Sequence, residues 1–333
     1  WEEGVIMKRI LTGLKPSGEL TLGSFIGGIK GTIERQEEYE SFLFVPDMHA
    51  ITVRQDPKLL KERIRKNVAL YLACGVDPDK NIIYLQSENL YHANLSWVLE
   101  CNTYMGEASR MTQYKDKSSK GENVTVGLFT YPILMASDIL LYDADYVPVG
   151  IDQKQHVELA RNIAERFNKI YGDTFKIPEP LIPEVGAKIM DLQNPTKKMS
   201  KSDETYKGVI LLLDDEKTIR KKIMSAITDS ENKVYYDLEN KPGISNLLTI
   251  YSSLKEISIK DAEEHFKDYN YGNLKKEVAD VVVEVLTNIQ TKYNKLINST
   301  EIDNILDKGK EITNKIAKEK QEEVFSKVGL GRY

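Results

Sequence analysis

The residues best suited to chemistry form a lysine- and serine-rich stretch just past the middle of the chain, Lys197-Lys198-Met199-Ser200-Lys201-Ser202. Asn194-Pro195 favours a turn before it, and a helical pattern begins near Asp214. Lysines three residues apart, interleaved with hydroxyl groups, suit a mobile loop that closes on the phosphates of a nucleotide. Lysine-rich loops are also common on solvated surfaces, so both interpretations stay open at this point.

A second candidate for phosphate binding lies near the start of the chain. Residues 9–14 read as a short strand, Lys15-Pro16-Ser17-Gly18 as a turn, and residues 22–39 as a glycine-punctuated helix that opens in Gly23-Ser24. A helix that begins after such a turn can hold phosphates at its N-terminus, although an ordinary strand-to-helix turn has the same pattern. Inside the helix, Gly27, Gly28 and Gly31 predict close approach by a neighbour or a ligand.

The elements that must position these residues alternate between strand and helix. Residues 41–45 and 81–86 read as buried strands, and 57–74 as a helix between them. Buried strands separated by helices predict an α/β fold with a doubly wound, Rossmann-like parallel sheet, in which ligands bind at the carboxyl ends of the strands. His49 follows the second strand, and could be a catalytic base or a hydrogen-bonded pocket residue.

A third group of candidates begins at Tyr131. Tyr131, Met135, Asp138 and Tyr142 fall at helical spacing, and Pro132 is expected in the first turn of this helix. A buried carboxylate at Asp138 needs donors, so it either binds a ligand or is a capping or salt-bridged group.

A short strand over residues 145–149 then leads to Gly150-Ile151-Asp152-Gln153 and a long helix containing His156. Gly150 would let a ligand approach the backbone, Asp152 could bind ribose hydroxyls, and Gln153 could bind an ammonium. Residues 115–121 carry three lysines, which either reach phosphates or belong to a solvated loop.

The rest of the chain reads as a small all-α domain. Helices are expected near residues 215–227, 245–254, 259–266 and 274–297, and from 301 almost to the end. In the helix of residues 274–297, apolar side chains recur at helical spacing at Leu274, Val278, Val282, Val285, Ile289 and Leu296.

Composition narrows the classes of function. The 333 residues predict about two domains, and 46 basic against 51 acidic residues give a net charge of -5, which argues against non-specific nucleic-acid binding. Cys74 and Cys101 are expected to be free thiols, and no structural metal site is expected. Without a membrane-span or signal pattern, we expect a cytoplasmic protein with no membrane partner and no DNA partner.

These motifs together resemble the bacterial-type tryptophanyl-tRNA synthetases, which are class I aminoacyl-tRNA synthetases. The resemblance covers residues 7–333 and rests on the runs 131–142 and 147–156, on Lys198 to Ser202, on residues 13–18 and on Pro242-Gly-Ile-Ser-Asn246. The family's first signature, His-Ile-Gly-His in its ideal form, corresponds here to Thr21-Leu22-Gly23-Ser24, and Lys15 stands where glutamine is common.

The resemblance implies a reaction and a set of binding residues. Tryptophan and ATP would form tryptophanyl-adenylate and pyrophosphate, with Mg²⁺ on the phosphates, and the tryptophanyl group would pass to the 3′ end of tRNA(Trp). Catalytic charge would come from Lys198, Lys201 and Lys117. ATP would be bound by Lys15, Pro16, Ser17, Gly23, Ser24, Gly150, Ile151, Asp152, Ile189, Lys198, Met199, Ser200, Lys201 and Ser202. Tryptophan would be bound by Leu11, His49, Tyr131, Met135, Asp138, Ile139, Val147 and Gln153.

Chemistry supports this choice of substrate. Indole N–H only donates, so Asp138 offers it an acceptor while Met135 packs against the ring.

The resemblance also implies a division of the chain. We expect a Rossmann-like catalytic domain over residues 7–195, a signature loop over 196–206, a helical anticodon-binding domain over 207–298, and a last helix over 299–333 that packs back on the catalytic domain. A homodimer is expected by resemblance alone. The alternatives are a tyrosyl-tRNA synthetase, a small-molecule adenylyltransferase of the same superfamily, and a synthetase-like protein that binds tRNA or tryptophan without catalysis.

Overall fold

The computed structural model describes residues 7–14, 16, 18–112, 125–150, 153–182, 187–199 and 206–332. Five strands form one parallel sheet in the order β3-β2-β1-β4-β5. Their bounds are β1 Arg9–Gly13, β2 Glu40–Val45, β3 Asn81–Leu85, β4 Tyr146–Pro148 and β5 Glu179–Leu181. The strand order reverses at β1, as in a doubly wound sheet, so the fold class expected from the sequence is confirmed.

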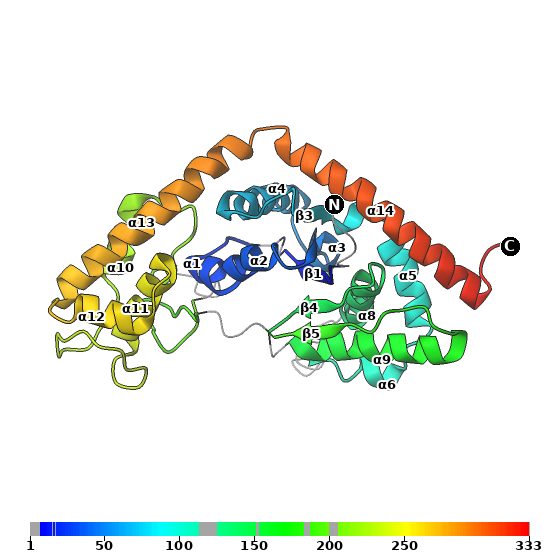
Figure 1. The fold of residues 1–333 in the computed structure, drawn as a ribbon, viewed down its shortest axis with the longest axis horizontal. Coiled ribbons are helices and arrows are strands. Elements are labelled where there is room, and N and C mark those ends of the chain that lie inside the picture. Colours follow the sequence, from blue (N-terminus) through cyan, green and yellow to red (C-terminus); the bar gives the residue numbers. More distant parts are fainter. Residues whose placement is uncertain are drawn as a thin grey trace.

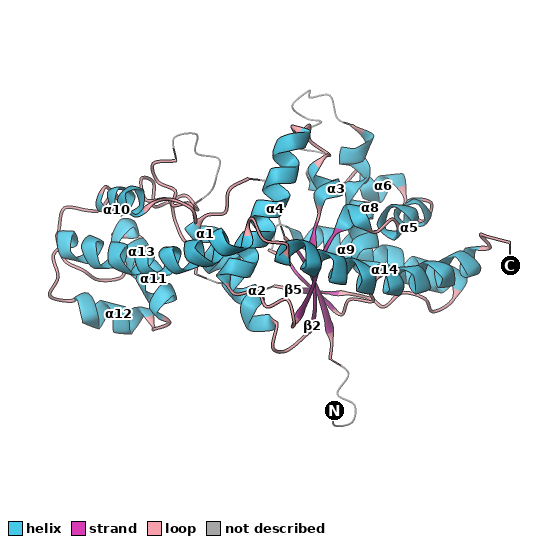
Figure 2. Ribbon diagram, turned by 90° about the horizontal axis from the view of Figure 1, so that it is seen from above, coloured by secondary structure: helices cyan, strands magenta, loops and turns pink. Residues whose placement is uncertain are grey.

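Helices cover both faces of the sheet (Figure 2). Around the first half of the chain they are α1 Leu22–Ser24, the π-helix η1 Phe25–Ile29, α2 Lys30–Arg35, α3 Asp47–Ala50, α4 Pro57–Cys74, the 3₁₀ turn η2 Gln86–Glu88, α5 Tyr91–Glu100, α6 Met105–Ala108, α8 Val126–Leu140 and α9 Lys154–Tyr171. Further along are α10 Glu216–Met224, α11 Pro242–Lys255, α12 Ile259–Phe266, α13 Tyr271–Leu296 and α14 Glu301–Val328.

Alternation along β2 shows how the sheet is buried on both sides. Leu43 and Val45 enter one hydrophobic cluster with α4, α11 and α13, whereas Phe42 and Phe44 enter a second cluster with α5, α8 and α9. Successive side chains of a strand point to opposite faces, so a strand covered on both faces must be apolar throughout. This explains the apolar run Phe42 to Val45 in β2.

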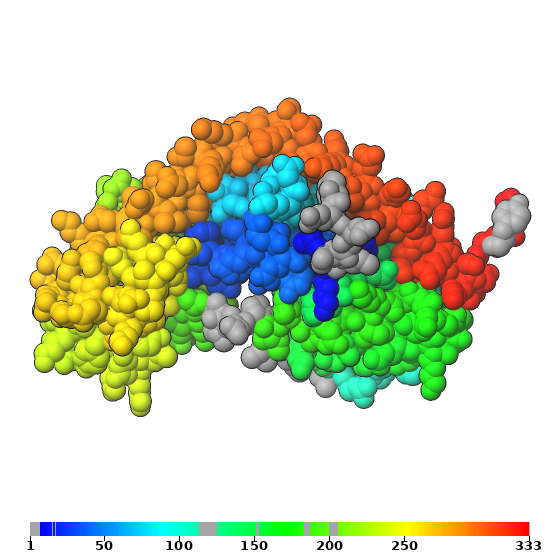
Figure 3. All heavy atoms as spheres, in the orientation of Figure 1, coloured from blue at the N-terminus to red at the C-terminus, as the bar shows by residue number. Residues whose placement is uncertain are grey.

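The helical elements α10 to α13 form a separate group beside the sheet, and α13 and α14 meet at the apex of an arch (Figure 1). Helix α14 returns along β3 and α5. At Gly309 a Cβ atom would lie 1.8 Å from the carbonyl oxygen of Ile83, so only glycine lets α14 approach β3 this closely. Opposite the apex, the surface is hollowed between the helical group and α9 (Figure 3).

Two local expectations were wrong. Pro132 lies inside α8 and not in its first turn, because the helix already begins at Val126, where the Thr125 side chain caps it by accepting the Leu128 N–H. The helix expected over residues 22–39 is three segments, with a π-helix at its glycines. None of the described helices is long and apolar enough to cross a membrane.

Candidate active site

A cleft of about 690 Å³ opens at the carboxyl ends of β1 and β4, where the strand order reverses. In doubly wound sheets this is where ligands bind, because the loops that follow the two strands leave in opposite directions. Described residues that line it include Gly13 and Leu14 after β1, Gly23, Ser24, Gly27 and Gly28 on the first helix, Val149 and Gly150 after β4, and Lys198 and Met199. The structure therefore brings two candidate phosphate-binding motifs and Gly150 to one cleft.

The beginning of the first helix forms one wall of the cleft. Thr21 caps it, accepting a hydrogen bond from the Ser24 N–H at 3.0 Å, and the Leu22 N–H donates to the Ile210 carbonyl at 2.9 Å. The Ser24 hydroxyl lies 3.1 Å from that of Thr21. Two of the first amides thus already have protein acceptors, which reduces the number that could face a phosphate.

Glycine at position 23 permits contact with the lysine-serine stretch. A Cβ atom there would lie 3.3 Å from the Met199 Cβ, so a larger residue would have to displace this neighbour. Of the helix's other glycines, Gly28 has no neighbour within 4 Å of such a Cβ atom, and it faces the cleft. The close approach predicted there by a protein neighbour is absent among the described residues.

Lys198 and Met199 belong to a short antiparallel hairpin. Met190 pairs with Lys198, the Met199 N–H donates to the Ile189 carbonyl at 2.9 Å, and the Asp191 N–H donates to the Lys197 carbonyl at 2.8 Å. Met199 and Ile189 are buried, whereas Lys198 is exposed and lines the cleft. The hairpin thus fixes the backbone of Lys198 and leaves its side chain free to reach an anion.

A second group of polar side chains surrounds Asp138 on α8. Asp138 is fully buried, and its Oδ1 accepts hydrogen bonds from Gln86 Nε2 at 2.8 Å and from His92 Nδ1 at 2.6 Å. His49 Nε2 lies 2.7 Å from Oδ2. Burial by itself would raise the pKa of Asp138, but the charge and hydrogen bonds of His49 and His92 outweigh it and hold the pKa below its ordinary value. The salt-bridged interpretation of Asp138 is therefore correct, and His49 is the described partner of its Oδ2.

The proton positions around Asp138 follow from the network of partners. Gln86 accepts from the Met48 N–H through Oε1, at 3.2 Å, which turns its Nε2 toward Asp138. Asn89 donates to the Tyr142 hydroxyl at 3.0 Å, and that hydroxyl lies 2.8 Å from His92 Nε2. If the hydroxyl donates to Nε2, His92 carries its proton on Nδ1 and donates to Asp138. The network therefore holds a carboxylate ready to accept.

Tyr131 stands next to this group. Its hydroxyl lies 2.6 Å from His156 Nε2, and its ring meets that of His49 edge-on at 6.0 Å between centroids. Burial raises the pKa of Tyr131 to about 12, so the hydroxyl stays protonated at neutral pH. Met135 is partly buried against the hydrophobic cluster that α5, α8 and α9 form on one face of the sheet. Leu11, Ile139 and Val147 lie inside that cluster, and the Gln153 N–H donates to the Gly150 carbonyl at 2.9 Å.

Not every predicted site residue can be placed. Pro16 is buried between β1 and the first helix. The following predicted residues lie outside the described residues: Lys15, Ser17, Lys117, Ile151, Asp152, Ser200, Lys201 and Ser202.

Sequence reasoning also missed functional neighbours. His92, Gln86 and His156 were not predicted as partners of Asp138 and Tyr131. A usable signal was present, since the chain has only four histidines and three of them lie in this group.

Comparisons with known proteins agree with this geometry. The family model of the class I tRNA synthetases (W and Y) matches residues 7–287. The tryptophan–tRNA ligase of Bacillus anthracis is 52% identical over 326 residues, which cover 98% of this chain and 99% of that protein. That of Bacillus subtilis is 53% identical over 323 residues, or 97% and 98% of the two chains.

Solved structures give the same result. The tryptophanyl-tRNA synthetase of Mycoplasma pneumoniae matches with a TM-score of 0.86 and 38% identity, covering 98% of this chain and 99% of that one. The Campylobacter jejuni enzyme, solved with ADP and tryptophan, matches with a TM-score of 0.84 and 37% identity over 97% and 100%. The sheet order, the cleft at its reversal point and these matches along almost the whole length show that the chain belongs to the class I tRNA synthetases of the tryptophan and tyrosine group.

Proposed function

We propose that this chain is a tryptophan–tRNA ligase that activates L-tryptophan with ATP and transfers it to tRNA(Trp). Relatives at about half identity over nearly the whole chain carry this activity in their names, and the Campylobacter jejuni structure holds ADP and tryptophan. The single observation in the structure that carries the proposal is the meeting of Gly23 with Met199 and Lys198 in the cleft between β1 and β4.

The cleft is the proposed ATP site. Gly23 and Gly150 line it, and so does the apolar side chain of Met199, whose N–H is held by the carbonyl of the buried Ile189. Lys198 supplies positive charge for the phosphates. By resemblance, Lys201 and Lys117 add to that charge. Mg²⁺ would arrive on the phosphates of ATP, which supply the oxygen ligands it prefers.

The activation step needs alignment and charge stabilisation more than proton transfer. The tryptophan carboxylate is already ionised at neutral pH, so one of its oxygens can attack the α-phosphorus without a general base. A bond forms between that oxygen and phosphorus while the bond to pyrophosphate breaks, and the leaving group takes the negative charge. Lys198 stabilises this developing charge.

The group around Asp138 is the proposed tryptophan pocket. Asp138 Oδ2 has one donor, His49, and a second lone pair that suits the indole N–H, which cannot accept. Tyr131 and Gln153 are proposed to hold the α-ammonium, and Met135 to pack against the ring. Tyrosine would place a hydroxyl that both donates and accepts against the same carboxylate, so the pocket favours tryptophan.

Other partners follow from the same family. We propose that the helical group of α10 to α13 contacts the anticodon, within the division into residues 7–195, 196–206, 207–298 and 299–333.

A second copy is proposed to cover large apolar side chains that are more than 60% exposed on and beside α5, α6 and the start of α8, namely Trp97, Tyr104, Met105 and Val126. Sedimentation of the wild type and of Trp97→Glu would test this surface, because a monomeric wild type contradicts it.

Amino-acid-dependent ATP–pyrophosphate exchange tests the function. We expect exchange with tryptophan and none with tyrosine, and a loss of about 10²- to 10³-fold in kcat in Lys198→Ala, as when one preorganised donor is removed. Lys197→Ala is the matched control, since Lys197 is also exposed but is not among the residues lining the cleft. Exchange supported by tyrosine, or by neither amino acid, would refute the proposed substrate or the proposed catalysis, respectively.

A further inference from the structure

The motif Pro242-Gly-Ile-Ser-Asn246 opens helix α11, outside the cleft, and most of its residues have a clear structural role. A Cβ atom on Gly243 would lie 2.0 Å from the Ile227 carbonyl oxygen, so this position requires glycine. Ser245 Oγ accepts the Asp237 N–H at 2.8 Å. The remaining polar residue, Asn246, directs both of its side-chain hydrogen bonds to a residue outside α11.

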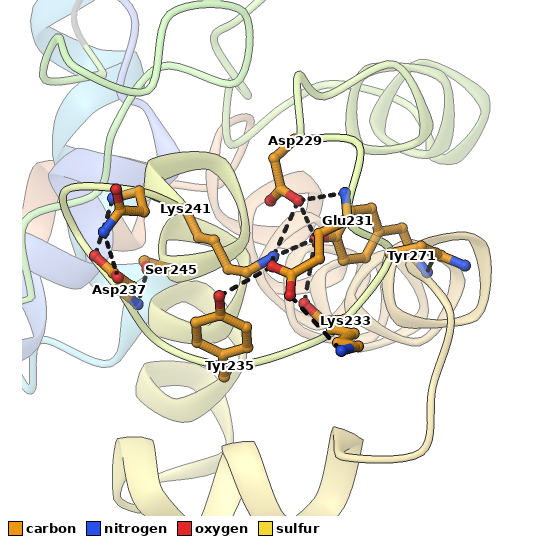
Figure 4. Close-up of polar contacts among 10 residues, drawn as sticks. Asp229, Glu231, Lys233, Tyr235, Asp237, Lys241, Ser245 and Tyr271 are labelled. Carbon is orange, nitrogen blue, oxygen red and sulfur yellow. Dashed lines mark hydrogen bonds and ion pairs between the residues drawn. The ribbon is translucent and has the colours of Figure 1, made fainter.

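The start of α11 is held in place by charged contacts of the residue before it. Lys241, just before it, is buried, and its Nζ lies 2.7 Å from Glu231 Oε2, 2.8 Å from the Tyr271 hydroxyl and 3.0 Å from Asp229 Oδ1 (Figure 4). The Tyr271 hydroxyl, which belongs to α13, also donates to Asp229 Oδ1 at 2.6 Å. These charged contacts tie the preceding loop and α13 to the start of α11.

Asn246, in the first turns of α11, forms hydrogen bonds with the hairpin that carries Lys198. Its Oδ1 accepts the Met190 N–H at 2.8 Å, and its Nδ2 donates to the Met190 carbonyl at 2.9 Å. Asn246 is 4% exposed, so both bonds are shielded from water. Met190 is also the residue that pairs with Lys198 across the hairpin. One side-chain amide therefore fixes the strand directly opposite Lys198.

The hairpin also forms hydrogen bonds with the segments just before and after α10. The Leu192 N–H donates to the Gly208 carbonyl at 2.9 Å, and the Leu192 carbonyl accepts the Ile227 N–H at 2.8 Å. Gln193 Nε2 donates to the Ser225 carbonyl at 2.9 Å. Toward the sheet, Met199 of the hairpin packs against Gly23. Among the described residues, the hairpin is thus hydrogen-bonded to α11 and to the segments before and after α10, and its contact with the first helix is apolar.

We propose that Asn246 is a positioning residue for ATP: it clamps Met190 and thereby fixes the hairpin backbone that presents Lys198 to the cleft. This inference rests on the proposed function for the role of Lys198. It assigns to a residue outside the cleft an effect on ATP and not on tryptophan, because the Asp138 group has no described contact with the hairpin.

Two variants separate the bonds of the clamp. Asn246→Ala removes both, and Asn246→Asp keeps the acceptor for the Met190 N–H but loses the donor to its carbonyl. Thr249→Val is the matched control, because Thr249 Oγ1 donates to the Ser245 carbonyl one turn further along α11 and has no bond to the hairpin. Urea unfolding shows which variants are folded; if Asn246→Ala is not, the nearly isosteric Asn246→Asp carries the test.

The first readout is pyrophosphate exchange with separate titrations of ATP and tryptophan. We expect kcat/KM for ATP to fall about tenfold or more in Asn246→Ala, since two buried hydrogen bonds are lost, while tryptophan affinity changes less than about twofold. In Asn246→Asp the ATP defect should shrink as pH falls from 8 to 6, because a buried carboxyl takes up a proton readily and its neutral form again donates to the carbonyl. Equal losses for ATP and tryptophan, or a result equal to Thr249→Val, would overturn the positioning role.

The second readout is independent of activity. Hydrogen exchange of the peptide containing Met190, measured without substrates, should be about tenfold or more faster in Asn246→Ala than in the wild type and in Thr249→Val. Unchanged exchange at Met190 would refute the clamp whatever the kinetics show. A wild type that lacks tryptophan-dependent pyrophosphate exchange would instead refute the proposed function and leave the clamp to be decided by this measurement.

Discussion

Replacing Asp138 by asparagine tests the tryptophan pocket while keeping its shape. The carboxylate accepts from Gln86 and His92 at Oδ1 and from His49 at Oδ2. In Asp138→Asn the amide oxygen can keep the first two donors, and the amide NH₂ can donate to His49 Nε2 if that ring carries its proton on Nδ1. The indole N–H would then meet an NH₂ group, so the variant should fold and bind tryptophan poorly.

The magnitudes follow from the bonds exchanged. Charge-assisted hydrogen bonds become neutral ones, but the variant no longer pays to bury a carboxylate, so we expect the free energy of unfolding to change by less than about 2 kcal/mol. Tryptophan loses a hydrogen bond to a charged acceptor, which is worth about 1.5–3 kcal/mol. At about 1.4 kcal/mol for each factor of ten, its affinity should fall about 10- to 150-fold.

Calorimetric titration with two ligands isolates the indole N–H. The ligands are tryptophan and β-(3-benzothienyl)alanine, in which sulfur replaces the N–H in a ring of similar shape. The wild type should prefer tryptophan by about 10- to 150-fold, and Asp138→Asn should discriminate by no more than a few-fold. If the variant weakens both ligands equally, or the wild type binds both equally, Asp138 does not accept the indole N–H and the reasoning fails.

Two further predictions concern stability and are measured by urea unfolding. Gly309→Ala should lower the free energy of unfolding by about 1–3 kcal/mol or more, because its Cβ would lie 1.8 Å from the Ile83 carbonyl oxygen. Gly106→Ala, which meets nothing within 4 Å, should raise the free energy of unfolding slightly, and equal effects of the two substitutions would contradict the packing of α14. Lys241→Met should lower the free energy of unfolding at pH 7 by less than the about 3–5 kcal/mol of a fully buried ion pair, because Asp229 and Glu231 are partly exposed. Partial burial opposes ionisation of Asp229, but hydrogen bonds from Tyr271 and Lys241 outweigh it and hold its pKa below the ordinary value. The ionised Asp229 carboxylate therefore adds to the free energy of unfolding above about pH 4, and this stabilisation is lost as pH falls through the lowered pKa. The difference in stability between wild type and Lys241→Met should narrow in that acidic range, and a difference independent of pH would contradict this.

Some elements could be predicted from the sequence because their signals are local. The helix over residues 57–74 agrees with the structure at both ends, where Asp56 caps it, Pro57 opens it and Gly75 ends it with a φ of 117°. The buried strands predicted a parallel sheet, and the observed strand order confirms the doubly wound fold. A cap, a breaker or an apolar run acts on residues a few positions away, so the printed sequence contains the whole interaction.

Other local features depended on distant packing. The helix expected over residues 22–39 contains a π-helix at Gly27 and Gly28, where the chain faces the cleft. Pro132 was expected to open a helix that in fact begins at Val126. A helix boundary or a change of pitch is worth little free energy locally, so contacts with the rest of the fold decide it.

What the sequence by itself determined was the fold class and a set of candidate residues for the chemistry, such as Lys198, Gly23 and Asp138, because residue type and short-range spacing define both. Only the tertiary structure decided the partners of those residues. His92 lies 46 positions from Asp138 and Asn246 lies 56 positions from Met190, and each pair is joined by hydrogen bonds of 2.6–2.9 Å. Such bonds form only after the chain has folded, since their geometry depends on how whole helices and strands pack and not on any neighbouring sequence.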